Sequence, residues 1–118
     1  METGILTVKI QPMKKSDIDD VVAIEAKAYG EHHWSKESFY NELSNDLARY
    51  YSVYNQNDEL IAYAGCWQIL EEAHITNIAV SPEYKRKHVG ESLLVTIIEE
   101  CYRNMAKYIT LEVRVSNF

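Results

Sequence analysis

The strongest constraint on the fold of this chain is a strand, a helix and a second strand that follow one another near its C-terminus. A short strand is predicted over His74–Val80, and residues 109–115 alternate apolar with polar side chains, as a half-buried strand does. Between them, apolar residues recur at helical spacing over three turns: Leu93, Leu94, Ile97, Ile98, Cys101, Tyr102 and Met105. Such a connection is right-handed and places its strands parallel, so the chain must build an α/β sheet.

Two helices are predicted upstream of this unit. A first strand over residues 6–10 ends at Pro12. Ser16 is expected to cap the first helix, Gly30 to end it, and Ser35 to cap the second helix. The expected buried side chains are Ile18, Val21, Val22, Ala28 and Tyr29 in the first helix, and Phe39, Leu43 and Leu47 in the second.

A β-hairpin is predicted between the second helix and the strand–helix–strand unit. Its strands are Tyr50–Tyr54 and Leu60–Ile69, and Asn55–Asp58 forms the turn. The element order is therefore β-α-α-β-β-β-α-β. We expect one domain over residues 1–118, of the α/β class, with helices packed on a mixed sheet.

Composition narrows the class of function. A net charge of −6, from 18 acidic and 12 basic residues, argues against a general nucleic-acid binder. The longest uncharged stretch, Leu60–Leu70, is much shorter than the ~20 residues that span a bilayer, and no signal-peptide pattern is present. Cys66 and Cys101 form no disulfide framework, so we expect a reduced, cytoplasmic protein. Three histidines lack metal-ligand spacing and are expected in surface or structural roles: His32, His33 and His74.

A basic turn lies inside the strand–helix–strand unit. Lys85, Arg86 and Lys87 follow the first strand and precede the helix. The first N–H groups of a helix have no partner within it, and the helix dipole adds positive charge at that end. Cations at this place in an acidic chain predict a site for a polyanion such as a pyrophosphate. The alternative is a solvated basic turn, but the strand before it favours binding.

Four segments resemble the GNAT-fold N-acetyltransferases, and above all the bacterial RimI type, which acetylates the N-terminal alanine of a small-subunit ribosomal protein. They are Ile24-Glu25, Trp34-Ser35 with Phe39, Asn77–Leu94 and Leu111–Asn117. The resemblance covers most of the chain from Ile24 onward. It implies a GNAT fold, acetyl-CoA as cofactor and the N-terminal amine of a protein as acceptor.

The resemblance also implies which residues hold acetyl-CoA. In the family, the strand before the phosphate loop diverges from the next strand, and its backbone pairs with the pantetheine arm. That strand corresponds to Ile78, Ala79 and Val80. The phosphate loop corresponds to Arg86, Lys87, His88, Val89, Gly90 and Glu91, and a further contact corresponds to Asn117.

Two positions depart from the family's loop pattern, Gln/Arg-x-x-Gly-x-Gly/Ala. Lys85 stands at the first position and keeps a positive charge, and His88 stands where the family has glycine. If the backbone there needs a positive φ, His88 costs free energy that glycine would not. We expect acetyl-CoA binding to be retained but weakened.

Glu112 is the candidate general base. An N-terminal amine has a pKa of about 8, against about 10.4 for lysine, so a carboxylate can accept its proton near neutral pH. Glu112 lies on the polar face of the last predicted strand, and its family counterpart is the base; the alternative is an ion pair with Arg114. The resemblance places Glu25, Tyr29 and Trp34 along the acceptor groove, with packing an equal alternative for the last two.

Three functions remain open from the sequence. The family's general acid is a tyrosine in a helix after the last strand, and no residue before Phe118 corresponds to it. Two later strands of the family fold are also absent from the given sequence, which leaves open a homodimer through an exposed strand edge. The candidates are an N-terminal protein acetyltransferase, a GNAT enzyme for a small-molecule amine, and a non-catalytic CoA-binding or association module.

Overall fold

A computed structural model describes residues 6–112 of the chain. The elements are β1 (Lys9–Pro12), α1 (Ile18–Tyr29), α2 (Lys36–Leu43), β2 (Ala48–Tyr54), β3 (Leu60–Ile69), β4 (Glu72–Val80), α3 (Val89–Arg103) and β5 (Tyr108–Leu111). The predicted order β-α-α-β-β-β-α-β and the α/β class are both confirmed. Ser35 caps α2 through its hydroxyl, and Gly30 ends α1 with a φ of +56°, as predicted.

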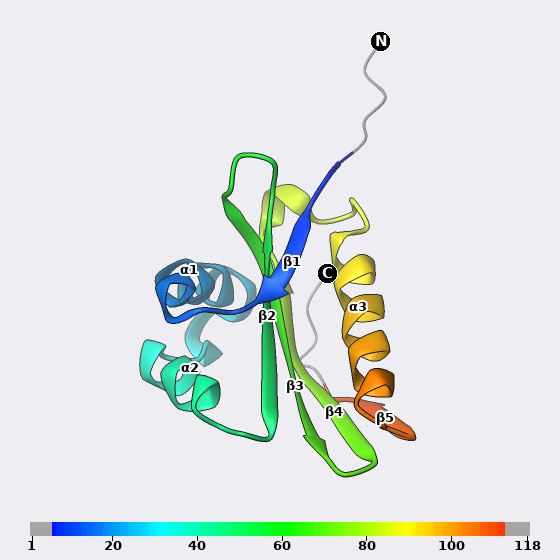
Figure 1. The fold of residues 1–118 in the computed structure, drawn as a ribbon. Helices are drawn as coiled ribbons and strands as arrows, with labels where there is room; N and C mark the ends of the chain where they lie inside the picture. The colour runs from blue at the N-terminus through cyan, green and yellow to red at the C-terminus, as the bar shows by residue number, and fades with distance from the viewer. Residues whose placement is uncertain (1–5, 113–118) are drawn as a thin grey trace.

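The strands form one five-stranded sheet in the order β1-β2-β3-β4-β5. Neighbouring strands are antiparallel from β1 to β4, whereas β4 and β5 are parallel. Helices α1 and α2 cover one face of the sheet and α3 covers the other (Figure 1). The parallel pair is the one predicted from the strand–helix–strand unit, because α3 connects its two strands.

Each face of the sheet has its own apolar core. On the α3 face, the buried side chains include Ile75, Ile78, Val80, Leu93, Ile97 and Cys101. On the α1 and α2 face, they include Ile18, Val21, Phe39, Tyr50, Tyr63 and Ala79. Because successive residues of β4 contribute to opposite cores, this strand is buried on both sides.

Tyr50 crosses the sheet to reach β4. It pairs in register with Gly65 of β3, which pairs with Asn77 of β4, and the Asn77 side-chain amide donates to the Tyr50 hydroxyl at 2.9 Å. The ring passes over Gly65, where a Cβ would lie 2.2 Å from a ring carbon. The register between β3 and β4 shifts at this point, so that Thr76 is the extra residue of a β-bulge. The bulge therefore lies where three strands share one buried contact.

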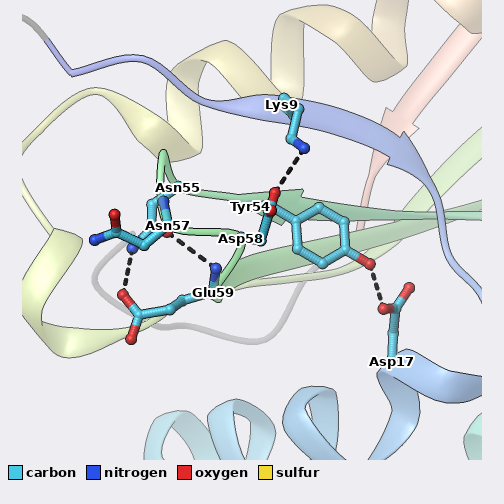
Figure 2. A network of polar contacts seen from close by, with 7 residues as sticks. All are labelled: Lys9, Asp17, Tyr54, Asn55, Asn57, Asp58 and Glu59. Carbon is cyan, nitrogen blue, oxygen red and sulfur yellow. Dashed lines mark hydrogen bonds and ion pairs between the residues drawn. The ribbon is translucent and has the colours of Figure 1, made fainter.

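Asn55 fixes the turn between β2 and β3 (Figure 2). Its side-chain oxygen accepts hydrogen bonds from the N–H groups of Asn57 (2.9 Å) and Glu59 (3.0 Å). Its side-chain amide donates to the Glu59 carboxylate (2.8 Å) and to the hydroxyl of Tyr84 (3.0 Å). Tyr84 belongs to a 3₁₀ turn directly before the basic residues, so the hairpin turn holds the start of that segment.

Two contacts tie the N-terminal elements to the hairpin. Lys9 of β1 forms an ion pair with Asp58 in the hairpin turn at 2.7 Å (Figure 2). The Tyr54 hydroxyl donates to the carboxylate of Asp17 at the start of α1. Burial, together with this hydrogen bond, raises the pKa of Tyr54 to about 12.

The predicted start of the first helix is wrong. The helix begins at Ile18 with Asp17 as its N-cap residue, so Ser16 does not cap it. The Asp17 carboxylate is buried and accepts from the backbone N–H of Lys14 (2.8 Å) and the hydroxyl of Ser52 (3.0 Å). The helix therefore starts after a buried, hydrogen-bonded Asp17 carboxylate and not after a Ser16 cap.

Four side chains that were expected to be buried are exposed: Leu47, Tyr102, Met105 and Leu111. Leu47 and Met105 lie beyond the ends of α2 and α3, and Met105 has a φ of +71°. Tyr102 lies in the last turn of α3, and Leu111 lies on β5 at the edge of the described sheet. The predicted continuation of the last strand through residues 113–115 lies outside the described residues.

Both cysteines are buried and free, with their sulfur atoms 4.0 Å apart between β3 and α3. The Arg49 guanidinium lies 3.5 Å from the Cys101 sulfur. The contact with Cys66 and the Arg49 guanidinium lower the pKa of Cys101, whereas the same thiol contact and burial raise the pKa of Cys66. Within residues 6–112, no helix is long and apolar enough to span a bilayer, and no cluster of potential metal ligands occurs.

Replacing Gly65 with alanine should destabilise the fold, because the new Cβ would clash with the Tyr50 ring. We expect Gly65→Ala to lower the free energy of unfolding by about 2 kcal/mol, measured by urea denaturation. The control is the same substitution in a Tyr50→Ala background, where its cost should fall below about 1 kcal/mol. An equal cost in both backgrounds would show that the ring contact is not the cause.

Candidate active site

Within residues 6–112, β5 pairs with only the first part of β4. Their ladder joins Glu72–Ile75 to Tyr108–Leu111, and just beyond it the Glu112 N–H donates to the Ile75 carbonyl at 2.9 Å. Within residues 6–112, no strand pairs with residues 76–80 on the β5 side, although β3 pairs with residues 77–80 on the other side. This unpaired stretch holds the three residues that the family resemblance assigns to the pantetheine arm: Ile78, Ala79 and Val80.

The basic turn lies at the end of this stretch. Lys85, Arg86 and Lys87 form none of the ion pairs found in the described part of the chain, and Lys87 lies 5.7 Å from the centre of the Tyr84 ring. The first intrahelical hydrogen bond of α3 runs from Ser92 to His88 at 3.0 Å. The N–H groups of residues 89–91 therefore have no acceptor within the helix, and they point with the positive end of the dipole toward the basic turn.

The backbone of the turn is left-handed at two non-glycine residues, Arg86 with a φ of +65° and His88 with a φ of +64°. His88 is the N-cap residue of α3 and makes no side-chain capping bond. Its ring instead lies beside Glu91, with Nδ1 and the carboxylate 3.2 Å apart. His88 therefore has the positive φ that was considered from the sequence. Glycine adopts this backbone conformation at a lower cost in free energy than histidine does.

Glu112 lies far from the basic turn along β4. It contacts the strand at Ile75, five residues before Val80, which corresponds to roughly 16 Å of extended backbone. A site with cations at one end and a carboxylate at the other fits a ligand with a long arm between its phosphates and its reactive group. The open backbone edge between them offers hydrogen-bonding groups to that arm.

Glu112 faces a hollow on the sheet face that α1 and α2 cover. The hollow has a volume of about 330 Å³ and is lined by Trp67, Ile69, His74, Thr76 and Glu112. The Glu112 carboxylate lies 3.2 Å from the His74 Nδ1 atom. The predicted alternative partner, Arg114, lies outside the described residues, as does the predicted CoA contact Asn117.

The three predicted acceptor residues lie beside β4 and β3, on the side of the sheet that carries α1. The Tyr29 hydroxyl donates to the Ile78 carbonyl at 2.8 Å, which joins a predicted acceptor residue to a predicted cofactor residue. Glu25 is fully buried; its carboxylate accepts from the Trp34 N–H at 2.6 Å and from the Tyr63 hydroxyl. Glu25 therefore holds the segment that carries Trp34, and the Trp34 ring packs against Phe39 with centroids 5.4 Å apart.

Sequence reasoning did not find His74, Thr76 and Trp67 at this site. The parallel pairing of their strand with the last one was predicted, but the register that aligns Ile75 with Leu111 was not. A period-2 pattern shows which residues share a face, and it gives no information about which residues of two strands lie side by side. The only available signal was that His74 shares its strand with the predicted cofactor residues.

Residues 18–118 match the model of the acetyltransferase (GNAT) family. This chain belongs to the GNAT family. It is 40% identical over 108 residues to a Bacillus subtilis protein named provisionally as a [ribosomal protein bS18]-alanine N-acetyltransferase. It is 34% identical over 109 residues to the enzyme of that name from Escherichia coli K12. Each match covers 92% of this chain and 71% of the relative.

Solved structures agree with this placement. The crystal structure of the ribosomal-protein-S18-alanine N-acetyltransferase from E. coli superposes with a TM-score of 0.82 at 30% identity, over 94% of this chain and 70% of that one. An aminoglycoside 6'-N-acetyltransferase from Acinetobacter baumannii reaches a TM-score of 0.78 at 16% identity, over 94% of this chain and 82% of that one. The second match shows the shared GNAT fold alone.

Relief of the left-handed strain at His88 should stabilise this GNAT domain. We expect His88→Gly to raise the free energy of unfolding by about 0.5–1 kcal/mol, measured by urea denaturation, because glycine adopts a positive φ without a Cβ clash. His88→Ala is the matched control: it removes the ring and keeps the Cβ, so it should bring no such gain. A similar gain from both variants would assign the effect to the ring instead of the backbone.

Proposed function

We propose that this GNAT enzyme transfers an acetyl group from acetyl-CoA to the N-terminal amine of a protein, with the alanine of a small-subunit ribosomal protein as acceptor. The observation that carries the proposal is the edge of β4 that no strand within residues 6–112 pairs with, which runs from a basic turn without ion pairs in those residues to Glu112. The acceptor rests on the relatives, whose names specify ribosomal protein bS18-alanine.

The residues of the chain fit acetyl-CoA. Arg86 and Lys87, which form no ion pair within residues 6–112, would bind its phosphates together with the N–H groups at the start of α3. The backbone of Ile78 and Val80, whose N–H and C=O groups alternate away from β3, would pair with its extended arm, whereas the backbone groups of Ala79 lie in the ladder with β3. When bound, acetyl-CoA supplies an activated thioester. The His88 N–H would still be available to the phosphates, although the His88 Cβ would leave them less room than the glycine of the family's loop.

Glu112 would act as the general base. Its side chain is 55% exposed at the rim of the hollow, so an incoming amine can reach it. The carboxylate would accept a proton from the ammonium group of the acceptor and leave the amine free to attack. The backbone N–H groups of β4 that face away from β3 would polarise the carbonyl that is attacked. Ala79, the candidate from sequence, offers none of them: Ser81 donates to the Ile61 carbonyl at 2.8 Å, so by antiparallel alternation the Ala79 N–H points to β3, and Ile78 or Val80 takes this role.

Two measurements test the activity and its acceptor class. Calorimetric titration with acetyl-CoA should show binding, and thiol release should follow when a peptide that begins Ala-Arg is added. The same peptide with an acetylated N-terminus should release none, and a small amine such as an aminoglycoside should release far less. Binding without transfer to any amine would instead support a CoA-binding module.

The base assignment predicts a split between catalysis and cofactor affinity. Glu112→Gln should lower kcat about 100-fold, because an amide cannot accept the proton, and should leave the Kd for acetyl-CoA within about twofold. The matched control is Glu72→Gln, which removes an exposed carboxylate from the same strand pair and should leave both values unchanged. A large loss of acetyl-CoA affinity in Glu112→Gln would overturn the assignment.

A further inference from the structure

We propose that His74 is a positioning residue for this acetyl transfer: its imidazole holds one oxygen of the Glu112 carboxylate and leaves the other facing the amine. The inference rests on the proposed function, in which Glu112 is the base. It adds a residue from the middle of the sheet that sequence reasoning placed in a surface or structural role.

The two side chains meet at the end of the described pairing between β4 and β5. His74 pairs in register with Thr110, and Ile75 pairs with Leu111. Glu112 then makes two contacts with β4: its N–H donates to the Ile75 carbonyl at 2.9 Å, and its Oε2 atom lies 3.2 Å from the His74 Nδ1 atom. Backbone and side chain of Glu112 are thus held by adjacent residues of one strand.

His74 is the less exposed partner of this contact. Its side chain is 29% exposed, against 55% for Glu112, and it pairs in register with Trp67 on its other side. The Trp67 indole N–H donates to Glu42 of α2 at 3.2 Å. The imidazole therefore presents Nδ1 to the carboxylate from a partly buried position between neighbouring strands.

The proton in this contact belongs on His74. An ionised carboxylate can only accept, so Nδ1 must carry the hydrogen. The terminal torsion of a free glutamate is broad, and a hydrogen bond to Oε2 restricts it and fixes the direction of Oε1. A misplacement of about 1 Å in a reacting group can cost about 100-fold in rate, so this restriction affects catalysis directly.

Two variants of His74 test the inference. His74→Leu should lower kcat about tenfold and leave the KM values for acetyl-CoA and the peptide within about twofold. His74→Asn, which places an amide N–H near the position of Nδ1, should restore kcat to within about threefold of the native enzyme. The control is Lys9→Leu, which removes an exposed ion pair at the far edge of the sheet and should not change kcat.

A double variant separates positioning from a general structural role. In a Glu112→Gln background, His74→Leu should have no further effect on kcat, because there is no base left to orient. An additional tenfold loss there, or an unchanged kcat in the single variant, would overturn the inference and leave the proposed function standing. Absence of acetyl transfer by the native enzyme would instead overturn both.

Nitrogen NMR gives a readout that does not depend on turnover. The His74 ring of the native protein should show the hydrogen on Nδ1 at mildly alkaline pH, and Glu112→Ala should shift the hydrogen toward Nε2. The same tautomer in both proteins would mean that the carboxylate does not hold the ring, and would contradict the inference.

Discussion

The structure depends on the part of β4 that follows Ile75. β3 pairs with β4 on both sides of Thr76, whereas within residues 6–112 β5 pairs with β4 only as far as Ile75. The bulge at Thr76 lies at this point, and bulges change the direction of a strand and end its pairing. The contact of Tyr50 with Asn77 across Gly65 stabilises the same region from the opposite neighbour. Within residues 6–112, the backbone of β4 after Ile75 therefore has no strand partner on the β5 side and can pair with a ligand.

Much of this arrangement could be predicted from the sequence. Periodicity gave the element order, and the handedness of the crossover gave the parallel pair, because both depend on local patterns and general chirality. The strain at His88 was predicted on the condition that the backbone there has a positive φ. The family has glycine at this position, and glycine is common where the backbone conformation is unfavourable for other residues. The predictions for Ser16, Leu47 and Met105 were wrong. Local patterns place a capping residue or a helix end only to within a few residues, and tertiary contacts decide the exact position.

The candidate site shows where such prediction stops. Glu112 was found through its place in a family motif, whereas His74 has no motif and becomes relevant only through the register of two strands. Glu25 illustrates the same limit, because its carboxylate was expected along the acceptor groove and instead lies buried against Trp34 and Tyr63. A buried carboxylate needs hydrogen-bond donors, and the spacing of residues along the sequence does not show which groups will donate.

The contact between Asn55 and Tyr84 has a consequence for the entropy of ligand binding. It fastens the start of the basic segment to a hairpin turn whose own geometry Asn55 already fixes. Part of the conformational freedom that an anion would otherwise have to remove is therefore lost when the chain folds, and a pre-organised loop binds more tightly for the same contacts. Affinity for a polyanion at the basic segment thus depends partly on the hairpin turn that holds Tyr84.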